Sequence, residues 1–248
     1  MVTSRIKLKI VGVIPVRLES TRLPRKALRT LSGRALVHHV YSRAAQCTLL
    51  TDLILATDSL EIEAYCRKHN LKVMMTSNEH QSGTDRIYEV ATRTQADIFV
   101  NVQGDEPMVS PKHIELLVEP FLASDAVQVT TLKTPISPEE AQDLSVNKVV
   151  TDTQGRALYF SHLPIPFCRD GATAPQYYKH LGFYAYRKDV IEKFSTLPVS
   201  PLEEVEKLEQ LRLLENGISI QVVETKINTI GVDTEEDFRK VEEYYLRV

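Results

Sequence analysis

The chain has 248 residues, of which 43% are hydrophobic and 25% charged, an ordinary globular composition that excludes disordered and fibrous classes. The net charge of −3 at pH 7 argues against a nucleic-acid partner or an anionic membrane partner. The three cysteines show no CxxC spacing, and no apolar run approaches the roughly 20 residues of a membrane span. We therefore expect a soluble, cytoplasmic protein.

Strands and helices are predicted to alternate through the first half of the chain. Apolar, β-rich runs predict strands at 9–14 (stopped by Pro15), 53–57, 72–75 and 98–102. Apolar residues at helical spacing lie between them, and Ser110-Pro111 has the form of a helix start. This alternation is typical of a parallel, doubly wound sheet.

The second half is predicted to be richer in strands. Runs at 127–132, 149–151, 157–160, 180–186 and 218–223 read as strands. One continuous helix is expected from Pro201 to Gly217, and a last helix follows Thr234 as its N-cap. We expect an α/β fold in which helices flank a mixed, mostly parallel central sheet, and a single domain over 1–248.

A basic loop follows the first strand. Arg17, Arg22, Arg25 and Lys26 stand within ten positions of one another, together with Ser20. Cations in a strand-to-helix connection favour a phosphate cradle over a solvated basic loop, which is the ordinary alternative. Neither GxxxxGK[ST] nor GxGxxG is present, so a P-loop NTPase and a dinucleotide-dependent dehydrogenase lose their main support.

Two aspartates, Asp105 and Asp233, each follow a strand-like run or a turn that contains glycine. Carboxylates combined with substrate phosphates are the ligands that Mg²⁺ prefers. Asp233 has an alternative role as a cap of the last helix, and spacing does not show that the two aspartates meet.

Two further polar segments carry candidate ligands. Ser82 and Gly83 stand at an expected helix start, where free N–H groups bind an anion or the edge of a base, although a plain N-cap turn explains them equally well. His180, Glu209 and Gln210 are polar residues among apolar ones, for which ordinary core or surface placement is the default.

Taken together, the ordered motifs resemble those of the 3-deoxy-manno-octulosonate cytidylyltransferases, also called CMP-Kdo synthetases. The resemblance covers almost the whole chain, from about Lys9 to the last helix. It rests on Ile14-Pro15-Val16-Arg17, Ser20-Thr21-Arg22-Leu23-Pro24-Arg25-Lys26, His80-Gln81-Ser82-Gly83-Thr84-Asp85-Arg86, Asn101-Val102-Gln103-Gly104-Asp105-Glu106-Pro107, His180-Leu181-Gly182, Glu209-Gln210 and Gly231-Val232-Asp233-Thr234.

The resemblance implies a Rossmann-like nucleotide-diphospho-sugar transferase fold and a reaction in which CTP and the sugar acid Kdo give CMP-Kdo and pyrophosphate for lipopolysaccharide synthesis. It implies a nucleotide-binding half (about 8–125), a sugar-binding and dimerisation half (about 126–230), a C-terminal metal ligand and helix (231–248), and a homodimer. The implied nucleotide ligands are Arg17, Ser20, Arg22, Lys26, Gln81, Ser82, Gly83 and Arg86. The implied Mg²⁺ ligands are Asp105 and Asp233, which with Lys26 and Arg22 form the catalytic set, whereas Glu106 is not assigned a role. The implied sugar ligands are Gln103, His162, His180, Tyr184, Glu209 and Gln210.

The chain departs from the family pattern at two positions. Arg25 stands where the family usually has Gly, and His162 stands where it usually has an Arg expected to face the sugar. Because His is shorter and lacks a permanent charge, this change leaves three hypotheses for the sugar site. The substrate is Kdo, it is an analogue such as 8-amino-3,8-dideoxy-Kdo or another acidic sugar, or another cation such as Arg169 takes the role.

A hypothesis of a different class is a nucleotide-binding sensor that keeps the fold without catalysis. Lys26, Asp105 and Asp233 argue against this class, since a sensor has no need of a second metal ligand.

Overall fold

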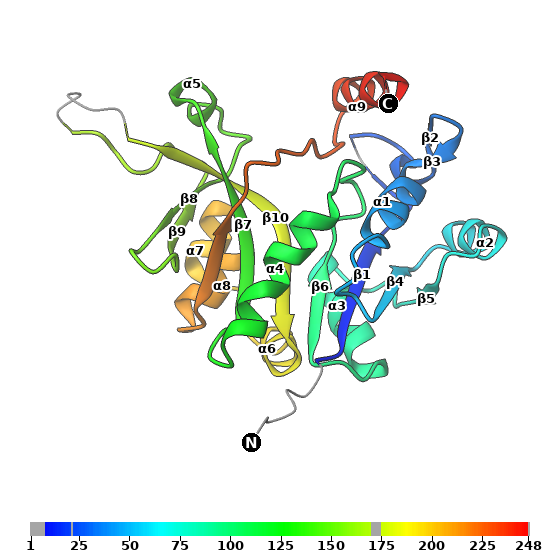
Figure 1. Ribbon diagram of the computed structural model, residues 1–248, viewed down its shortest axis with the longest axis horizontal. Coiled ribbons are helices and arrows are strands. Elements are labelled where there is room, and N and C mark those ends of the chain that lie inside the picture. The colour runs from blue at the N-terminus through cyan, green and yellow to red at the C-terminus, as the bar shows by residue number, and fades with distance from the viewer. Residues whose placement is uncertain (1–7, 21, 170–174, 248) are drawn as a thin grey trace.

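A mixed sheet organises the chain in the computed structural model, which describes residues 8–20, 22–169 and 175–247 (Figure 1). Its strands are β1 (Ile10–Val16), β4 (Asp52–Thr57), β5 (Val73–Met75), β6 (Ile98–Asn101), β7 (Val129–Ile136), β8 (Lys148–Thr151), β9 (Ala157–Ser161), β10 (Tyr177–Arg187) and β11 (Ile220–Glu224). They lie in the order β11-β7-β10-β6-β1-β4-β5, with β8 paired to β10 and to β9. Strand β1 is parallel to β4 and β6, whereas β10 is antiparallel to β6 and β7. The predicted α/β class is confirmed.

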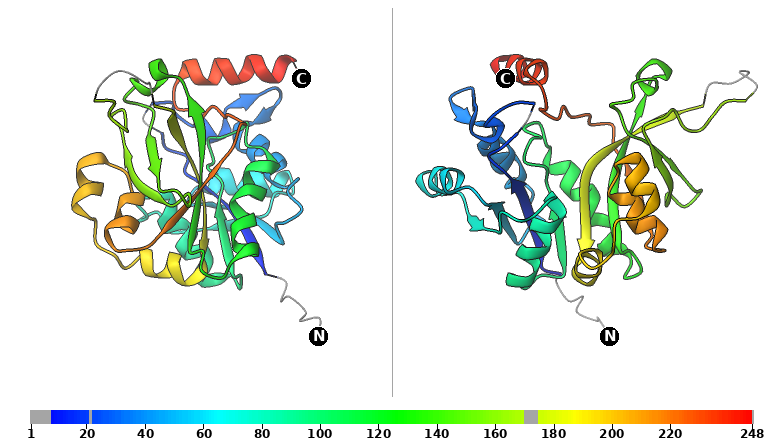
Figure 2. Two further views of the ribbon diagram at one scale, coloured as in Figure 1. Left: turned by 60° about the vertical axis from the view of Figure 1, so that its left-hand side comes forward. Right: turned by 180° about the vertical axis from the view of Figure 1, so that it is seen from behind.

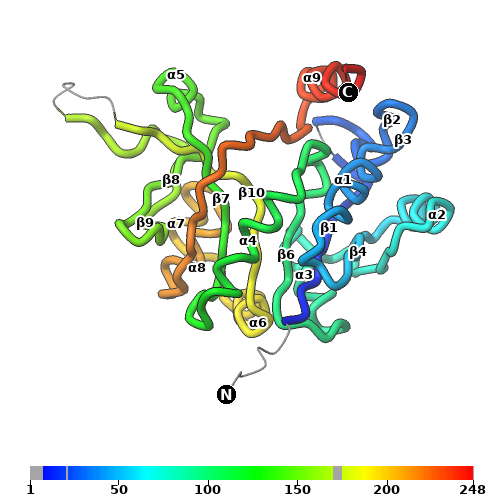
Figure 3. Tube along the Cα trace, viewed as in Figure 1, coloured from blue at the N-terminus to red at the C-terminus, as the bar shows by residue number. Residues whose placement is uncertain are grey.

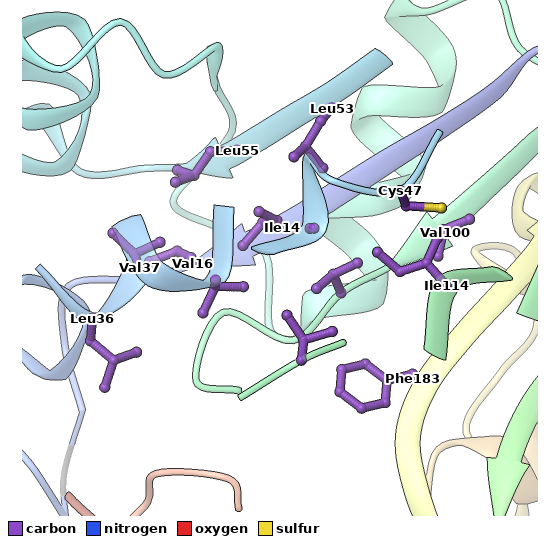
Figure 4. Packing of buried hydrophobic residues seen from close by; sticks show 14 of the residues in the cluster. Ile14, Val16, Leu36, Val37, Cys47, Leu53, Leu55, Val100, Ile114 and Phe183 are labelled. Atoms are coloured by element: carbon purple, nitrogen blue, oxygen red, sulfur yellow. The ribbon is translucent and has the colours of Figure 1, made fainter. Parts of the chain in front are cut away.

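Helices cover both faces of this sheet (Figure 2). On one face, α1 (Leu36–Ala44) and α4 (Pro111–Ala123) pack their buried residues into the core shown in Figure 4, in which Ile14 and Val16 of β1 lie near Leu36 and Val37. On the other face, α3 (Gly83–Arg93), α6 (Lys188–Phe194) and α8 (Gln210–Glu215) contribute to a second core. The remaining helices are α2 (Leu60–Lys68), α5 (Pro138–Ala141), α7 (Pro201–Glu206), α9 (Glu235–Arg247) and the short 3₁₀ turn η1 (Lys26–Leu28). A small hairpin of β2 (Thr30–Leu31) and β3 (Arg34–Ala35) precedes α1.

The first strand was predicted to stop before Pro15, and this boundary is wrong. Strand β1 runs through Pro15 to Val16 and pairs with β4 along that length. Its pairing with β6 reaches only Val13, so the segment that contains Pro15 has a strand partner on one side alone. An edge of this kind tolerates a residue without an N–H donor.

The single helix predicted from Pro201 to Gly217 is also wrong. It is broken into α7 and α8 by Lys207, whose φ of 56° lies in the left-handed region. The break places Glu209 and Gln210 at the start of α8. Helix α6 was not predicted, whereas Thr234 caps α9 as expected, since its Oγ1 accepts the Asp237 N–H at 3.2 Å.

The chain trace crosses the sheet once more near its end. From β11, residues 225–234 run across to α9, which lies at the far end of the molecule, close to β2 and β3 (Figure 3). This connection carries Asp233 to the same end as the loops that follow β1 and β6. The division of the chain into the three parts named above stays a prediction.

Candidate active site

Two neighbouring cavities lie at the carboxyl ends of β1 and β6, the place where ligands bind in open α/β sheets. We call them the loop cavity, of about 380 Å³, and the sheet cavity, of about 770 Å³. They share Arg22, Gly83, Gln103 and Asp233 as lining residues.

The loop cavity gathers all of the nucleotide ligands implied by the resemblance. Its walls come from the basic loop after β1, the start of α3 and the loop after β6. The predicted residues that line it are Arg17, Ser20, Arg22, Lys26, Gln81, Ser82, Gly83 and Arg86, together with Asp105 and Asp233. Residues 60 positions apart or more thus meet in one cavity, and the solvated-loop alternative does not account for that.

Lys26 joins the two aspartates. Its Nζ donates to Asp105 Oδ2 at 2.8 Å and to Asp233 Oδ1 at 3.0 Å, and Arg22 forms an ion pair of 3.1 Å with Asp233. Burial opposes the charge of Lys26, but Asp105 and Asp233 outweigh it and raise the pKa of the lysine above 10.5. The aspartates therefore do meet, and the Asp233 side chain serves this cluster while Thr234 and Asp237 cap α9.

Gly104 fixes the position of Asp105. A Cβ at Gly104 would lie 2.4 Å from Val16 Cγ2 and 2.7 Å from the Pro15 carbonyl oxygen, so only glycine lets the loop approach the end of β1 this closely. The neighbouring Glu106 points elsewhere and accepts a hydrogen bond from Thr229 Oγ1 at 2.6 Å. Burial raises the pKa of Glu106 to about 7.

Ser82 and Arg86, both predicted nucleotide ligands, have partners that belong to the fold. Ser82 caps α3 reciprocally with Asp85, so the interpretation of this segment as a plain N-cap is correct for its hydroxyl, and Ser82 and Gly83 also line the loop cavity. Arg86 is buried and donates to Asp58 Oδ2 at 2.5 Å and to Thr76 Oγ1 at 2.8 Å. Arg25 reaches Glu61 instead of the cavity, and its φ of 56° is the left-handed geometry that a glycine would adopt there without strain.

The sheet cavity holds five of the six implied sugar ligands, namely Gln103, His180, Tyr184, Glu209 and Gln210. Gln103 Nε2 donates to the Gly182 carbonyl at 3.0 Å, and Thr84 Oγ1 donates to Glu209 Oε2 at 2.7 Å. His180 lies 2.9 Å from Thr131 Oγ1, and burial lowers its pKa to about 3. The imidazole is therefore neutral at physiological pH and contributes polarity without charge.

Four residues that line the sheet cavity each carry a buried polar side-chain atom that has no partner among the described residues. The atoms are Asn101 Oδ1, Asn147 Oδ1, Tyr184 Oη and Gln210 Nε2. An unpaired buried polar atom costs roughly 1–3 kcal/mol, so a group of them in one cavity indicates a polar ligand. Asn101 and Asn147 were missed in the sequence. Asn101 is the polar last residue of an otherwise apolar strand, a pattern from which a ligand-facing position could have been predicted. Asn147 lies in a loop, where no such pattern marks it.

The structure does not bring His162 into either cavity. Its ring Nδ1 lies 2.7 Å from the Leu144 carbonyl oxygen, and its main-chain N–H donates to Glu206 Oε2 at 3.1 Å. Its carbonyl oxygen accepts from the buried Lys148 Nζ at 2.5 Å. Three contacts thus hold His162 outside the sheet cavity.

Asp105 and Asp233 fit the needs of a magnesium ion. Their oxygens approach the Lys26 ammonium to 3.0 Å or less, so the chain already concentrates two carboxylates around one positive charge. Within the described ranges no group of three or more His, Cys, Asp or Glu side chains forms a metal cluster. Two carboxylates supplemented by substrate phosphates suit Mg²⁺, which is seldom held by protein ligands alone.

Comparison with known proteins agrees with this geometry. Residues 11–224 match the family model described as "Cytidylyltransferase". The chain is 51% identical to the 3-deoxy-manno-octulosonate cytidylyltransferase of Koribacter versatilis, over 95% of this chain and 89% of that protein. It is likewise 51% identical to the enzyme of the same name from Acidobacterium capsulatum, over 96% and 97%.

The solved structure of a CMP:2-keto-3-deoxy-manno-octonic acid synthetase complexed with CTP superposes on this chain with a TM-score of 0.93. It is 43% identical to this chain and covers 96% of it and 99% of its own length. On this combined evidence of sequence and fold, the chain belongs to the 3-deoxy-manno-octulosonate cytidylyltransferases, within the cytidylyltransferase family.

Proposed function

We propose that the chain transfers the cytidylyl group of CTP to Kdo and releases pyrophosphate, in the branch of metabolism that supplies lipopolysaccharide. The anomeric hydroxyl oxygen of the sugar bonds to the α-phosphorus of CTP, the bond from that phosphorus to the β-phosphate bridging oxygen breaks, and the hydroxyl proton leaves to solvent. The relatives' names and the similarity over almost the entire chain support this reaction.

One observation carries the proposal most directly. A cationic cavity and a cavity with unpaired polar atoms meet at Asp233 and Arg22, which line both. A nucleotide triphosphate suits the first and a polyhydroxylated sugar suits the second. Their junction is the place where the hydroxyl oxygen and the α-phosphorus would meet, and such positioning, together with electrostatic stabilisation, is most of what a protein contributes to phosphoryl-type transfer.

Within this proposal the basic loop holds the triphosphate. Arg17, Arg22 and Lys26 offer permanent charges, and Ser20 offers a hydroxyl. Gln81, Ser82, Gly83 and Arg86 form the wall against which the cytidine would lie. Lys26, held between the two carboxylates, stabilises charge on the leaving phosphates without having to move far.

We assign Asp105 and Asp233 as the residues that hold Mg²⁺. An ion held there would neutralise phosphate charge and would lower the pKa of the attacking hydroxyl. The carboxylates of Asp105 and Asp233 supply negative charge to balance the positive charge of the ion. Arg22, paired with Asp233, keeps that carboxylate oriented toward the loop cavity.

Pyrophosphate release from CTP with a panel of acidic sugars tests the reaction. We expect turnover with Kdo in the presence of Mg²⁺, and none after chelation. The panel includes 8-amino-3,8-dideoxy-Kdo and a sialic acid, because the His162 change leaves the choice among acidic sugars to experiment. Calorimetry that shows CTP binding without product from any sugar would favour the sensor instead.

A homodimer is part of the proposal. Large apolar side chains are exposed around the β8–β9 hairpin, including Leu144 (59%), Leu158 (62%), Leu163 (61%) and Phe167 (85%). Exposed apolar residues close together are typical of interaction sites. Light scattering coupled to gel filtration would show a mass of about twice 28.1 kDa.

Residence in the cytoplasm, where CTP is available, completes the proposal. Among the helices of the described ranges, none has both the length and the apolar character that crossing a membrane requires.

A further inference from the structure

The sugar acid poses an electrostatic requirement that the residues assigned so far do not meet. A 2-keto acid in ring form carries its carboxylate on the anomeric carbon, directly beside the attacking hydroxyl. Bringing that carboxylate into a cavity is costly unless a cation faces it. Gln103, His180, Tyr184, Glu209 and Gln210 supply none, since His180 is neutral and Glu209 is an acid.

Three permanent cations line the sheet cavity in the part of the chain that the structure describes: Arg22, Lys179 and Lys240. Arg22 is paired with Asp233 at 3.1 Å and also lines the loop cavity, where the proposed function has it bind the triphosphate. Lys240 lies on α9 and is paired with Glu236 at 2.7 Å.

Lys179 differs from both. Its ammonium makes no hydrogen bond and no ion pair with residues 8–20, 22–169 or 175–247, although the side chain is partly buried. Its charge offsets part of the rise that burial causes in the pKa of Glu106, and it adds to the lowering of the Asp143 pKa that hydrogen bonds from Ser145 mainly cause. Lys179 lines the same cavity as Gln103 and Asp233, which also line the loop cavity, so it belongs to the cavity in which the anomeric carbon would lie.

The alternatives to Lys179 are placed elsewhere. His162 is held by the Leu144 carbonyl, Glu206 and Lys148, outside the cavity. Arg169 is exposed and is not among the residues that line the cavity. Lys148 is buried, and its ammonium is shared among the carbonyls of Asp143, Val146 and His162.

We propose that Lys179 binds the carboxylate of the acidic sugar and selects acids over neutral sugars, and that it supplies the positive charge expected of the Arg that the family usually has at position 162. This inference rests on the proposed function. Asn147, whose main-chain carbonyl oxygen accepts the His180 N–H, lines the same cavity and has an unpaired side-chain oxygen, which within this proposal would accept from a sugar hydroxyl.

Two variants, Lys179→Gln and Lys179→Arg, test the assignment. The dissociation constant of Kdo is measured by calorimetry on protein saturated with a non-hydrolysable CTP analogue and Mg²⁺. We expect Lys179→Gln to weaken Kdo binding roughly 10- to 100-fold, the usual effect of losing a charge-assisted hydrogen bond, and Lys179→Arg to stay within a few-fold of the wild type. Affinity for the CTP analogue should be unchanged in both.

A sugar probe separates carboxylate binding from a structural role. The C1 amide of Kdo has the same shape without the charge, so the wild type should prefer Kdo strongly and Lys179→Gln should nearly lose that preference. Lys240→Gln is the matched control, because it removes another cation from the same cavity, and it should keep the preference.

The assignment is overturned if Lys179→Gln keeps the wild-type preference for Kdo over its amide, or if its affinity for the CTP analogue falls as much as that for Kdo. Pyrophosphate release is measured in parallel. A wild type that binds Kdo but releases no pyrophosphate would refute the proposed reaction, whereas the ratio of dissociation constants would still decide the role of Lys179.

Discussion

The main-chain N–H of Val232 donates to the carbonyl oxygen of Asp105 at 2.9 Å. This single backbone contact ties the segment that carries Asp233 to the loop that carries Asp105, so the spacing of the two carboxylates is set by main chain and not by side-chain rotamers alone. Rigid placement of this kind is what a preorganised charge site requires.

We expect Asp105→Asn and Asp233→Asn each to lower kcat by roughly 100-fold or more, because each removes one of two negative charges from the proposed ion site. Kinetics at saturating CTP and sugar, with Mg²⁺ varied, measure the effect. Asp237→Asn is a control from the same helix region, since Asp237 caps α9. A wild-type magnesium dependence in either of the first two variants would remove that residue from the site.

Gly104→Ala should destabilise the fold by about 1–3 kcal/mol, because its Cβ would lie 2.4 Å from Val16 Cγ2 and the loop must shift. Activity should fall as well, since Asp105 moves with the loop. Gly182→Ala is the comparison: its nearest neighbour would be Gln103 Nε2 at an ordinary 3.8 Å. Urea denaturation that gives equal midpoints for both variants would contradict this reading.

Lys148→Met should cost about 3 kcal/mol of unfolding free energy. The methionine keeps the apolar part of this buried side chain, but the carbonyls of Asp143, Val146 and His162 lose their shared donor. Denaturant unfolding measures the loss, with the surface variant Lys188→Met as reference. If Lys148→Met is as stable as that reference, the three hydrogen bonds contribute nothing net.

His180 should make stability fall on acidification. Its folded pKa of about 3 lies below the ordinary 6.5, so below about pH 6.5 the unfolded chain takes up a proton that the folded chain excludes. The stabilising effect of the neutral imidazole is complete above pH 6.5 and is lost at about 1.4 kcal/mol for each pH unit below it. His180→Gln should lack this component, and a wild type and variant with identical slopes between pH 6.5 and 4.5 would show that the ring is not held neutral.

Arg25→Gly and Arg25→Ala should differ in stability by about 1 kcal/mol in favour of glycine. Both lose the contact with Glu61, an exposed pair of little weight, but only the alanine keeps a side chain at φ 56°. Thermal unfolding of the two variants measures the free energy that the left-handed backbone at position 25 costs a residue with a side chain. Equal stability would mean that the left-handed geometry at this position is not strained.

Local patterns were sufficient for most of the fold. Ser82 and Gly83 were expected at a helix start, which is where α3 begins, and Ser110-Pro111 predicted the start of α4. The break at Lys207 was not predictable in this way, because the leucine spacing continues across it and no glycine marks the left-handed residue. At Pro15 the sequence predicted a strand end that is not there. Proline usually ends a strand, but here it stands in a segment of β1 that pairs on one side only.

The candidate site likewise has features that local sequence patterns predict and features that depend on the fold. The charges of Arg22, Lys26, Asp105 and Asp233 stood out in the sequence because each follows a strand or turn at the ligand-binding edge. The convergence of the two aspartates on one ammonium depends on the path of residues 225–234, which no local pattern describes. Lys179 and Asn147 could not be identified from the sequence for a related reason. They stand out because their side chains lack hydrogen-bond partners among the described residues, and that is seen only in the folded structure.

The late position of Asp233 has a consequence for synthesis on the ribosome. Every strand of the sheet has been translated by Glu224, whereas the second carboxylate follows nine residues later and α9 after that. A nascent chain can thus assemble its nucleotide-facing loops while the carboxylate pair is still incomplete. The carboxylate pair is complete only when the segment that carries Asp233 lies against the loop after β6, and the Val232–Asp105 hydrogen bond joins those two segments.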